Sequence, residues 1–139
     1  DSGRIRQTKA VAIVHDGRLI AERYAPGYGP FTPMLSWSMA KSVLAAVAGV
    51  AIGDGRLALY EAAPVPEWAA PDDPRRAITI DQLLRMSSGL RFDETYGAIN
   101  DVSRMLFTMP DTGAFAAGFA LAADPDTVWS YSSGTASVY

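Results

Sequence analysis

Ser38 and Lys41 are the residues of this sequence whose types and spacing most favour covalent chemistry. Residues three positions apart share one face of a helix, about 5–6 Å apart at their Cβ atoms. The stretch from Ser36 to Ser42 reads as the first turn of a helix, so we expect a hydroxyl and an amine side by side at an end that favours negative charge. A lysine that loses contact with water has a lowered pKa and can take a proton from a neighbouring hydroxyl.

The helix that follows Lys41 is predicted to be buried. Residues 43–52 are apolar on every side, and a helix with that pattern is normally surrounded by protein. The alternative is a structural lysine whose stem reaches water, as lysines near helix ends commonly do. Only Lys9 and Lys41 are lysines, whereas arginine supplies the other positive charges. This bias favours a specific use for Lys41.

Composition limits the classes of protein to which the chain can belong. It has 139 residues, of which 49% are hydrophobic, enough for the core of about one domain. A net charge of −3 and scattered arginines give no reason to expect a nucleic-acid partner. The absence of cysteine excludes disulfides and a thiolate nucleophile, and it suits both cytoplasm and periplasm. No apolar run approaches the ~18 residues of a membrane span, so no membrane partner is expected.

The single histidine is predicted to be a surface residue. His15 follows a strand-like stretch and precedes the Asp-Gly pair of a turn. A Ser-His-Asp triad would need His15 as its base, and the sequence has no Gly-x-Ser-x-Gly elbow. A histidine-rich metal site is excluded as well. If Ser38 is a nucleophile, its base must therefore be a lysine or a tyrosine.

The N-terminal part predicts a β-hairpin followed by the Ser38 helix. Residues 9–14 and 18–24 read as strands, and the Asp-Gly pair between them is a strong hairpin signal. A connection rich in glycine and proline leads to the helix, which we expect to end at Gly53. A lone two-stranded hairpin is at best marginally stable. We therefore expect further polypeptide after residue 139, as a continuation or a second chain, that returns to the sheet.

A proline-rich loop and a capped helix come next. Residues 60–77 carry four prolines and predict an irregular surface loop, in which Trp68 is an anchor rather than a ligand contact. Thr79 and Gln82 have the spacing of a capping box, and the helix that they open is expected to end at Gly89. Its inward residues are predicted to be Ile80, Leu83 and Leu84.

Three more helices are predicted between residue 100 and the end of the sequence. A cap at 100–101 opens the first, which Pro110 closes. A cap at 111–112 opens the second, which is expected to run to about Ala123. Residues 135–139 read as the start of a third. The inward residues are predicted to be Val102, Met105, Leu106, Phe115, Phe119 and Ala122.

Tyr131 is the second candidate base and lies in a predicted loop, 128–134. A phenol has an ordinary pKa near 10, which a nearby ammonium can lower so that the phenolate acts as a base. The structural alternative is an aromatic plug beneath the helices, and Tyr139 competes for the same role. Serine, lysine and tyrosine are nonetheless the groups left for acyl transfer without histidine or cysteine. The candidate set is Ser38, Lys41 and Tyr131.

The order of these motifs resembles the penicillin-recognising serine hydrolases. The Ser-Met-Ala-Lys of Ser38 to Lys41, the Leu-Leu-Arg-Met-Ser-Ser-Gly-Leu of 83–90 and the Tyr-Ser-Ser of 131–133 follow the leading hairpin in the family's order. This family includes serine β-lactamases, penicillin-binding proteins, esterases and 6-aminohexanoate-dimer hydrolases. The Ser-Met-Ala-Lys-Ser stretch and the Tyr-x-Ser triplet are most similar to those of the branch of class C-like enzymes, esterases and nylon-oligomer hydrolases.

The resemblance implies an α+β, β-lactamase-like fold, with an antiparallel sheet flanked by helices and a helical subdomain. Residues 1–33 would supply a hairpin of the sheet, and residues 34–139 would supply the nucleophile helix and the helical subdomain. The family's third motif, a Lys-Thr-Gly-like strand, is absent from the sequence. Residues 1–139 would then form only the N-terminal portion of one domain. The remainder of the domain would follow residue 139, in the same chain or as a second fragment, and would be the partner of this portion.

The resemblance also implies a mechanism on an amide or ester substrate. Ser38 would attack the carbonyl, with its backbone N–H as one oxyanion donor, and Lys41 would accept the proton or hold Tyr131 as a phenolate. Tyr131 would pass the proton to the leaving group and later activate water. Ser133 would hydrogen-bond Lys41 or bind the substrate. No metal or cofactor is implied.

Other activities of the same family remain open at this point. Class C β-lactamases have Tyr-x-Asn where this chain has Ser133, and a serine lacks the amide donor, which argues against efficient β-lactam turnover. A β-lactamase or DD-peptidase and a penicillin-sensing domain that stalls at the acyl-enzyme are the alternatives. A third is a pseudoenzyme in which Ser38 caps the helix and Lys41 only reaches water.

Overall fold

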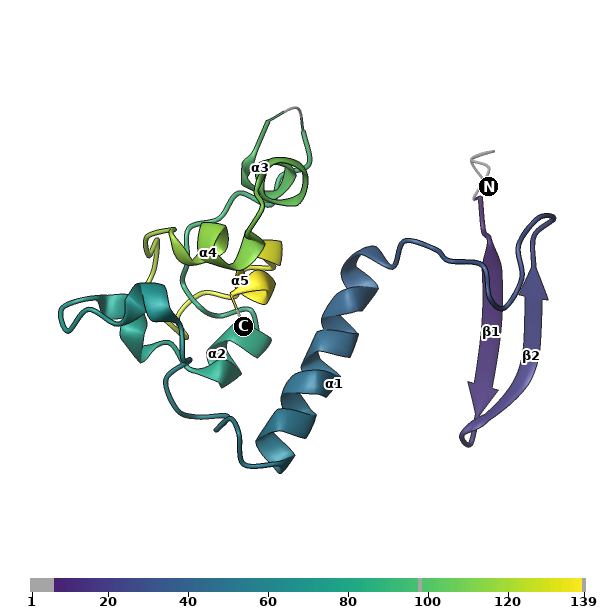
Figure 1. Cartoon of the computed structure of the whole chain (residues 1–139), viewed down its shortest axis with the longest axis horizontal. Helices are drawn as coiled ribbons and strands as arrows, with labels where there is room; N and C mark the ends of the chain where they lie inside the picture. Colours follow the sequence, from purple (N-terminus) through teal and green to yellow (C-terminus); the bar gives the residue numbers. More distant parts are fainter. Residues whose placement is uncertain (1–6, 98, 139) are drawn as a thin grey trace. The chain divides into compact units, whose positions relative to one another are not determined.

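The computed structural model describes residues 7–97 and 99–138. The chain divides into two compact units, Asp1–Ser36 and Trp37–Tyr139. The first unit carries the two described strands, and the second carries the described helices (Figure 1). Within these described ranges, no helix is both long and apolar enough to cross a membrane.

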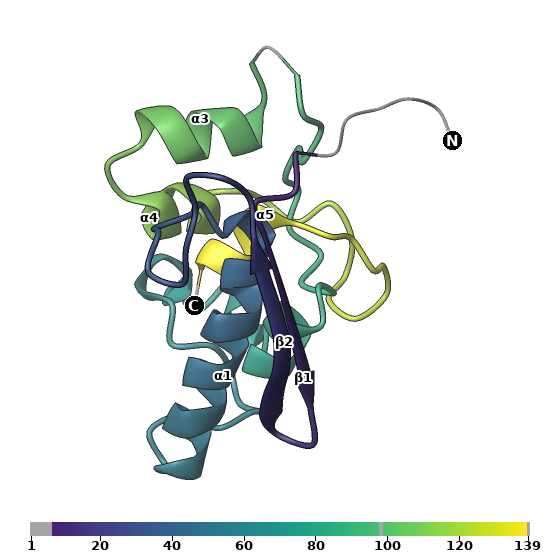
Figure 2. The ribbon, with the colours of Figure 1, turned by 90° about the vertical axis from the view of Figure 1, so that its right-hand side faces the viewer.

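The first unit is a β-hairpin, as the sequence predicts. Strand β1 (Ala10–His15) pairs with β2 (Arg18–Tyr24) in antiparallel fashion, and the two run side by side as a long ribbon (Figure 2). Both residues of the connecting turn have a positive φ, 47° at Asp16 and 71° at Gly17. A two-residue turn with positive φ at both positions matches the twist of the strands, which explains the Asp-Gly pair.

The second unit begins with a short 3-10 turn, η1 (Trp37–Met39), that leads into α1 (Ala40–Gly53). Helix α1 ends where the glycines predict, with Gly55 at a φ of 69°. The expectation of a helix buried on all sides is wrong for the described residues: Ala48 is its only buried residue, and Val43 is 65% exposed. The reason is that α1 packs on the unit's core mainly through Ile52, near its C-terminal end.

The proline-rich segment supplies part of the core of the second unit. This segment is not wholly irregular, because prolines start two 3-10 turns, η2 (Pro66–Trp68) and η3 (Pro74–Ala77). Trp68 is 1% exposed and its indole N–H donates to the Ala117 carbonyl at 2.9 Å. The prediction that Trp68 anchors the loop is therefore confirmed. The other members of the core cluster are Ala63, Val65, Ile78, Ile80, Leu83, Leu90 and Ala117.

Helix α2 (Ile80–Leu84) opens with the predicted capping box. The Thr79 side chain accepts from the Gln82 N–H, and the Gln82 side chain accepts from the Thr79 N–H. The helix ends before the predicted Gly89, because Met86 already turns the chain with a φ of 59°. Gly89 has another role: a Cβ there would collide with the Ala123 carbonyl, so this position lets two backbone segments meet.

Three helices follow, as the sequence pattern predicts, and one of them is clearly shorter than expected. They are α3 (Asp101–Thr108), α4 (Thr112–Ala117) and α5 (Ser133–Ser137). Asn100 and Asp111 cap α3 and α4 as expected, but α4 ends at Gly118 rather than near Ala123, so Phe119 lies beyond it. Leu106 is 45% exposed and not inward, because α3 buries only Val102 and Met105.

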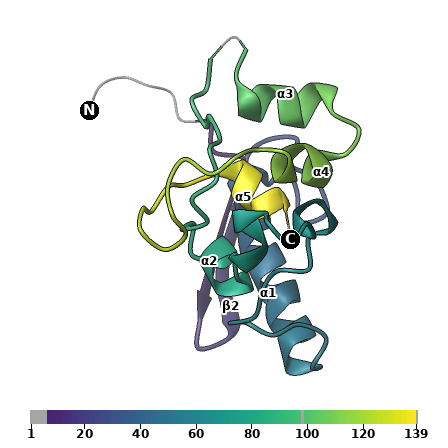
Figure 3. The ribbon, with the colours of Figure 1, turned by 90° about the vertical axis from the view of Figure 1, so that its left-hand side faces the viewer.

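Helix α5 lies against α2, α3 and α4 and begins two residues earlier than predicted (Figure 3). Its start is set by Ser132, whose hydroxyl accepts from the Thr135 N–H at 2.9 Å. Gly134 and Thr135 are buried, and a Cβ at Gly134 would collide with the ring of Phe92. The first turn of this helix is consequently held in a fixed place in the second unit.

Candidate active site

Ser38 lies in η1, directly before the first turn of α1, and its side chain is exposed. The residue before it, Trp37, has a φ of 46°, which a bulky side chain rarely adopts. Such strained residues persist only where the surrounding structure fixes them, and they cluster at functional sites. The turn thus presents the Ser38 hydroxyl to solvent beside the start of α1.

Lys41 brings two of the predicted site residues together. Its Nζ lies 3.4 Å from the Ser38 Oγ, the contact that the three-residue spacing predicts. The same Nζ donates to the Ser133 Oγ at 3.0 Å, across 92 residues of sequence. Lys41 is half-buried, so its amine is neither free in solvent nor enclosed.

Tyr131 also lies at Lys41, but it presents its ring. The Lys41 Nζ is 5.0 Å from the centroid of the Tyr131 ring, within the range of a cation–π contact. The tyrosine is 38% exposed. The competitor Tyr139 lies outside the described residues. The structure therefore gathers Ser38, Lys41, Tyr131 and Ser133, all of them in the second unit.

Glu94 contacts the candidate residue Ser133, and nothing in the sequence indicates this contact. The Ser133 N–H donates to Glu94 Oε2 at 2.7 Å, and the Ser133 hydroxyl donates to Glu94 Oε1 at 2.6 Å. Ser133 is 9% exposed, so this carboxylate meets a nearly buried partner. Glu94 and Ser133 are 39 residues apart and Glu94 sits in an unpatterned loop. No local signal in the sequence could have linked the two.

Tyr96 closes the group on the far side of Glu94. Its hydroxyl donates to Glu94 Oε1 at 3.3 Å. Its pKa is raised above the usual value, first by loss of water around the phenol, then by the negative charge of Glu94 and the hydrogen bond to it. The phenol consequently keeps its proton and remains a donor to Glu94.

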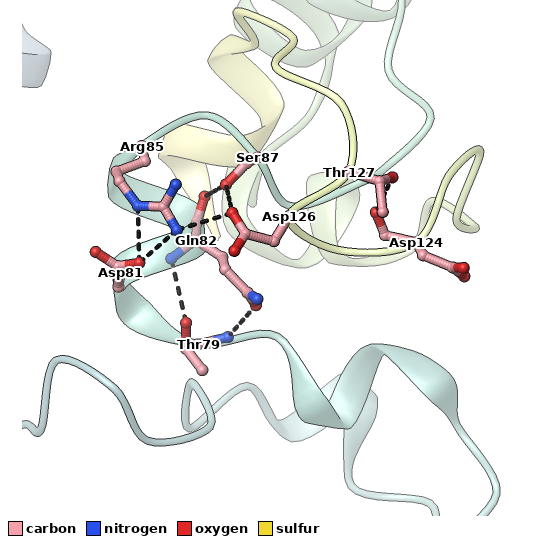
Figure 4. A network of polar contacts seen from close by, with 8 residues as sticks. All are labelled: Thr79, Asp81, Gln82, Arg85, Ser87, Asp124, Asp126 and Thr127. Atoms are coloured by element: carbon pink, nitrogen blue, oxygen red, sulfur yellow. Dashed lines mark hydrogen bonds and ion pairs between the residues drawn. The ribbon is translucent and has the colours of Figure 1, made fainter.

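A network of polar contacts holds the loop that leads to Tyr131 (Figure 4). The Arg85 guanidinium pairs with Asp81 at 2.6 Å and with Asp126 at 2.9 Å, and the Ser87 hydroxyl donates to Asp126 at 3.3 Å. These bonds, that to Asp81 foremost, raise the pKa of Arg85. Beyond the figure, the Ser130 N–H donates to the Met86 carbonyl at 2.8 Å. The chain just before Tyr131 is therefore tied to the end of α2.

Ser88 of the 83–90 motif contacts the helix that carries Ser133. The buried Ser88 hydroxyl lies 2.9 Å from that of Thr135, which is in α5 with Ser133. This bond connects the segment after α2 to α5, and the close approach at Gly89 connects the same segment to the backbone at Ala123. The motif thus helps to set the position of Ser133 and does not itself reach Ser38.

His15 is a surface residue, as the sequence predicts. Its side chain is 73% exposed and lies 3.4 Å from the carboxylate of Asp16. Among the described residues, no group of three or more histidine, aspartate or glutamate side chains could hold a metal ion.

Comparisons with known proteins address the family and the fold. The beta-lactamase family profile matches residues 4–138. A solved structure from Bacillus anthracis, provisionally named a 6-aminohexanoate-dimer hydrolase, superposes with a TM-score of 0.70 at 23% sequence identity. The match covers 92% of this chain and 37% of the Bacillus protein. Curated proteins give no match.

These findings confirm the predicted family and fold. The hairpin and the helices together form the part of a β-lactamase-like α+β fold that the chain supplies, and this is a hydrolase fold. Because the family profile spans nearly all of the sequence, this chain belongs to the beta-lactamase family.

Proposed function

We propose that this protein is a serine hydrolase that cleaves an amide or ester bond through a Ser38 acyl-enzyme. The observation that carries the proposal is the position of the Lys41 Nζ, 3.4 Å from the Ser38 Oγ and 3.0 Å from the Ser133 Oγ. A nucleophile and a base within hydrogen-bond reach, with a third group that orients the base, form the arrangement that activates a hydroxyl. Catalytic hydrogen bonds are often long in the absence of substrate.

Lys41 serves as the base for Ser38. In its neutral form the amine accepts the Ser38 proton as the hydroxyl oxygen bonds to the substrate carbonyl carbon. The ammonium that results has two stabilising neighbours already in place: the Ser133 oxygen and the face of the Tyr131 ring. Both contacts become stronger once the amine carries the positive charge.

Tyr131 then acts at the later steps. Lys41 contacts the face of its ring rather than its hydroxyl, which supports the direct lysine route over a Tyr131 phenolate for the first proton transfer. The phenol gives its proton to the leaving group as the bond from that group to the carbonyl carbon breaks. The resulting phenolate takes a proton from the water that attacks the acyl group, and the Lys41 ammonium returns its proton to the Ser38 oxygen as the acyl–oxygen bond breaks. The Ser38 backbone N–H is one oxyanion donor, and such a donor typically contributes ~10²–10³ in rate.

The substrate class is a small amide or ester. The provisional name of the Bacillus anthracis neighbour refers to a linear amide, which supports an amide. The Ser133 hydroxyl donates a hydrogen bond to Glu94 and accepts one from Lys41. Of the two roles predicted for Ser133, this favours holding Lys41 over binding substrate.

The test compares Ser38→Ala and Lys41→Ala with a matched control, Ser42→Ala, in the full chain. Ser42 is an exposed serine next to Lys41 and is not among the grouped site residues. Hydrolysis of p-nitrophenyl acetate should be lost in Ser38→Ala, fall by at least about 10²-fold in Lys41→Ala, and remain in Ser42→Ala. Activity retained in both site variants would contradict the proposal.

A further inference from the structure

We propose that Glu94 is a positioning residue, which holds the Lys41 amine at Ser38 by fixing the hydroxyl of Ser133. This inference rests on the proposed function of Ser38 and Lys41. In the described part of the chain, Glu94 and Lys41 form no direct ion pair. They are linked by the Ser133 Oγ, which lies 2.6 Å from the Glu94 Oε1 and 3.0 Å from the Lys41 Nζ. The positioning therefore acts through one hydroxyl.

The direction of these hydrogen bonds decides what Ser133 can do. A serine hydroxyl has one proton and two lone pairs. An ionised carboxylate can only accept, so the Ser133 proton is committed to Glu94 and its lone pairs are left for the Lys41 amine. A bond of 2.6 Å to a carboxylate is of the strong, charge-assisted kind. Glu94 thus turns Ser133 into a fixed acceptor.

Lys41 needs such an anchor because its side chain is long. A lysine amine ends a flexible stem of four carbons, and its bond to Ser38, at 3.4 Å, is too long to hold it. The Ser133 contact is the shorter of its two bonds. Two further titratable groups lie beside this chain of contacts: the Tyr96 hydroxyl donates to Glu94, and the Tyr131 ring lies beside the Lys41 amine.

The competing explanation is that Glu94 only caps α5. Its second oxygen accepts the Ser133 N–H at 2.7 Å, a bond that would stabilise the helix start without any effect on Lys41. The two roles use different atoms of the same residue. Ser133→Ala removes the hydroxyl and leaves the N–H, so it separates them.

A double-mutant cycle in the full chain tests the positioning role. The variants are Glu94→Gln, Ser133→Ala and the double variant, with Glu67→Gln as control, because Glu67 is exposed and has no side-chain hydrogen bond to a described residue. The measurement is the rate at which a fluorophosphonate labels Ser38. We expect Glu94→Gln to slow labelling on the order of 10²-fold, to have little further effect in the Ser133→Ala background, and Glu67→Gln to have none.

A second readout does not depend on activity. Lys41 is the only lysine of the second unit, and Lys9 is the only other lysine of the chain. With ¹³Cε-labelled lysine, NMR should therefore show two signals, assigned with Lys41→Arg. At one neutral pH, the Lys41 signal should move toward that of a solvated lysine in Glu94→Gln and in Ser133→Ala alike, and the Lys9 signal should stay.

The outcomes separate this inference from the proposed function. If Glu94→Gln slows labelling as much in the Ser133→Ala background as in the wild type, or leaves the Lys41 signal in place while the variant stays folded, the positioning role is wrong. If the wild-type protein shows no label on Ser38, the proposed function fails. The NMR comparison still decides the placement of Lys41 in that case.

Discussion

The Lys41 Nζ donates to the Ser133 Oγ at 3.0 Å, although the two residues are 92 positions apart in the sequence. Lys41 is in the first turn of α1 and Ser133 is the first residue of α5, so the bond joins the starts of two helices. The Ser132 hydroxyl caps the start of α5, whereas the start of α1 has no side-chain cap and follows the unusual backbone conformation of Trp37. The candidate site therefore forms where two helix starts from distant parts of the sequence meet, and substitutions can test each start separately.

The first prediction concerns the charge of Lys41. Lys41→Arg keeps a cation that can contact Ser133, but a guanidinium does not lose its proton in proteins and cannot serve as a base. We expect hydrolysis of p-nitrophenyl acetate to fall by about 10²–10⁴-fold. Lys9→Arg, the same change at the other lysine, should have no effect. An active Lys41→Arg protein would show that the residue acts only through its charge.

The second prediction concerns the network that holds the Tyr131 loop. Asp126→Asn weakens the contact of Arg85 with this loop and leaves its shorter contact with Asp81 (Figure 4). Exposed ion pairs contribute little to stability, so the melting temperature should change little while kcat falls because Tyr131 is less well placed. Asp124→Asn is the control, since only its backbone carbonyl bonds Thr127. Equal effects of the two variants on kcat would contradict this role.

The third prediction concerns pH and Asp73. The bond from Arg75 holds the pKa of Asp73 below its usual value in the folded protein. A carboxylate whose pKa is lowered by folding stabilises the fold above its unfolded pKa and loses that contribution as the pH falls through the folded value. Asp73→Asn should therefore be less stable than wild type at neutral pH, and the gap should close in acid. Thermal unfolding from neutral pH to pH 3 measures this.

The matched control for Asp73 is its neighbour. Asp72 is exposed and has no hydrogen bond to a described residue, so Asp72→Asn should be as stable as wild type at every pH. A gap between wild type and Asp73→Asn that is constant with pH would mean that ionisation of Asp73 does not matter.

The fourth prediction concerns the close approach at Gly89. Gly89 has a φ of 76°, and a Cβ there would collide with the Ala123 carbonyl. Gly89→Ala should lower the free energy of unfolding by more than about 1 kcal/mol. Gly53→Ala is the control, because a Cβ at Gly53, in the last turn of α1, meets nothing within 4 Å. Urea denaturation of both variants checks the contrast; equal stabilities would show that the segments at 89 and 123 can move apart.

Local signals predicted the elements that local chemistry determines. The Asp-Gly turn, the glycine stop of α1, the capping box at Thr79 and the cap at Asn100 lie where the sequence places them, because each depends on residues within a few positions. Helix lengths were less predictable. Helix α2 ends at Leu84, and Met86 then turns the chain with a φ of 59°, which its side chain does not indicate. The Met86 carbonyl accepts from the Ser130 N–H, a contact between distant segments.

The candidate site was predictable where spacing or order carried the information. Ser38 and Lys41 follow from the helical repeat, and Tyr131 and Ser133 follow from the order of motifs. Glu94 could not be found, because its contact with Ser133 depends on how a loop without periodicity packs against α5. The exposure of α1 was also missed, since an apolar pattern gives the preference of a helix for burial and not the residues that cover it.

In the proposed mechanism Ser38 carries the acyl group, and the acylated residue can be identified by mass spectrometry. The full chain is mixed with p-nitrophenyl acetate, quenched, digested and examined by mass spectrometry, beside Ser38→Ala and Ser42→Ala. We expect an acetyl group on the peptide that contains Ser38, localised to Ser38, in the wild type and in Ser42→Ala, and none in Ser38→Ala. Wild-type protein that hydrolyses the ester with the acetyl group on another residue, or equal turnover by Ser38→Ala, would contradict this mechanism.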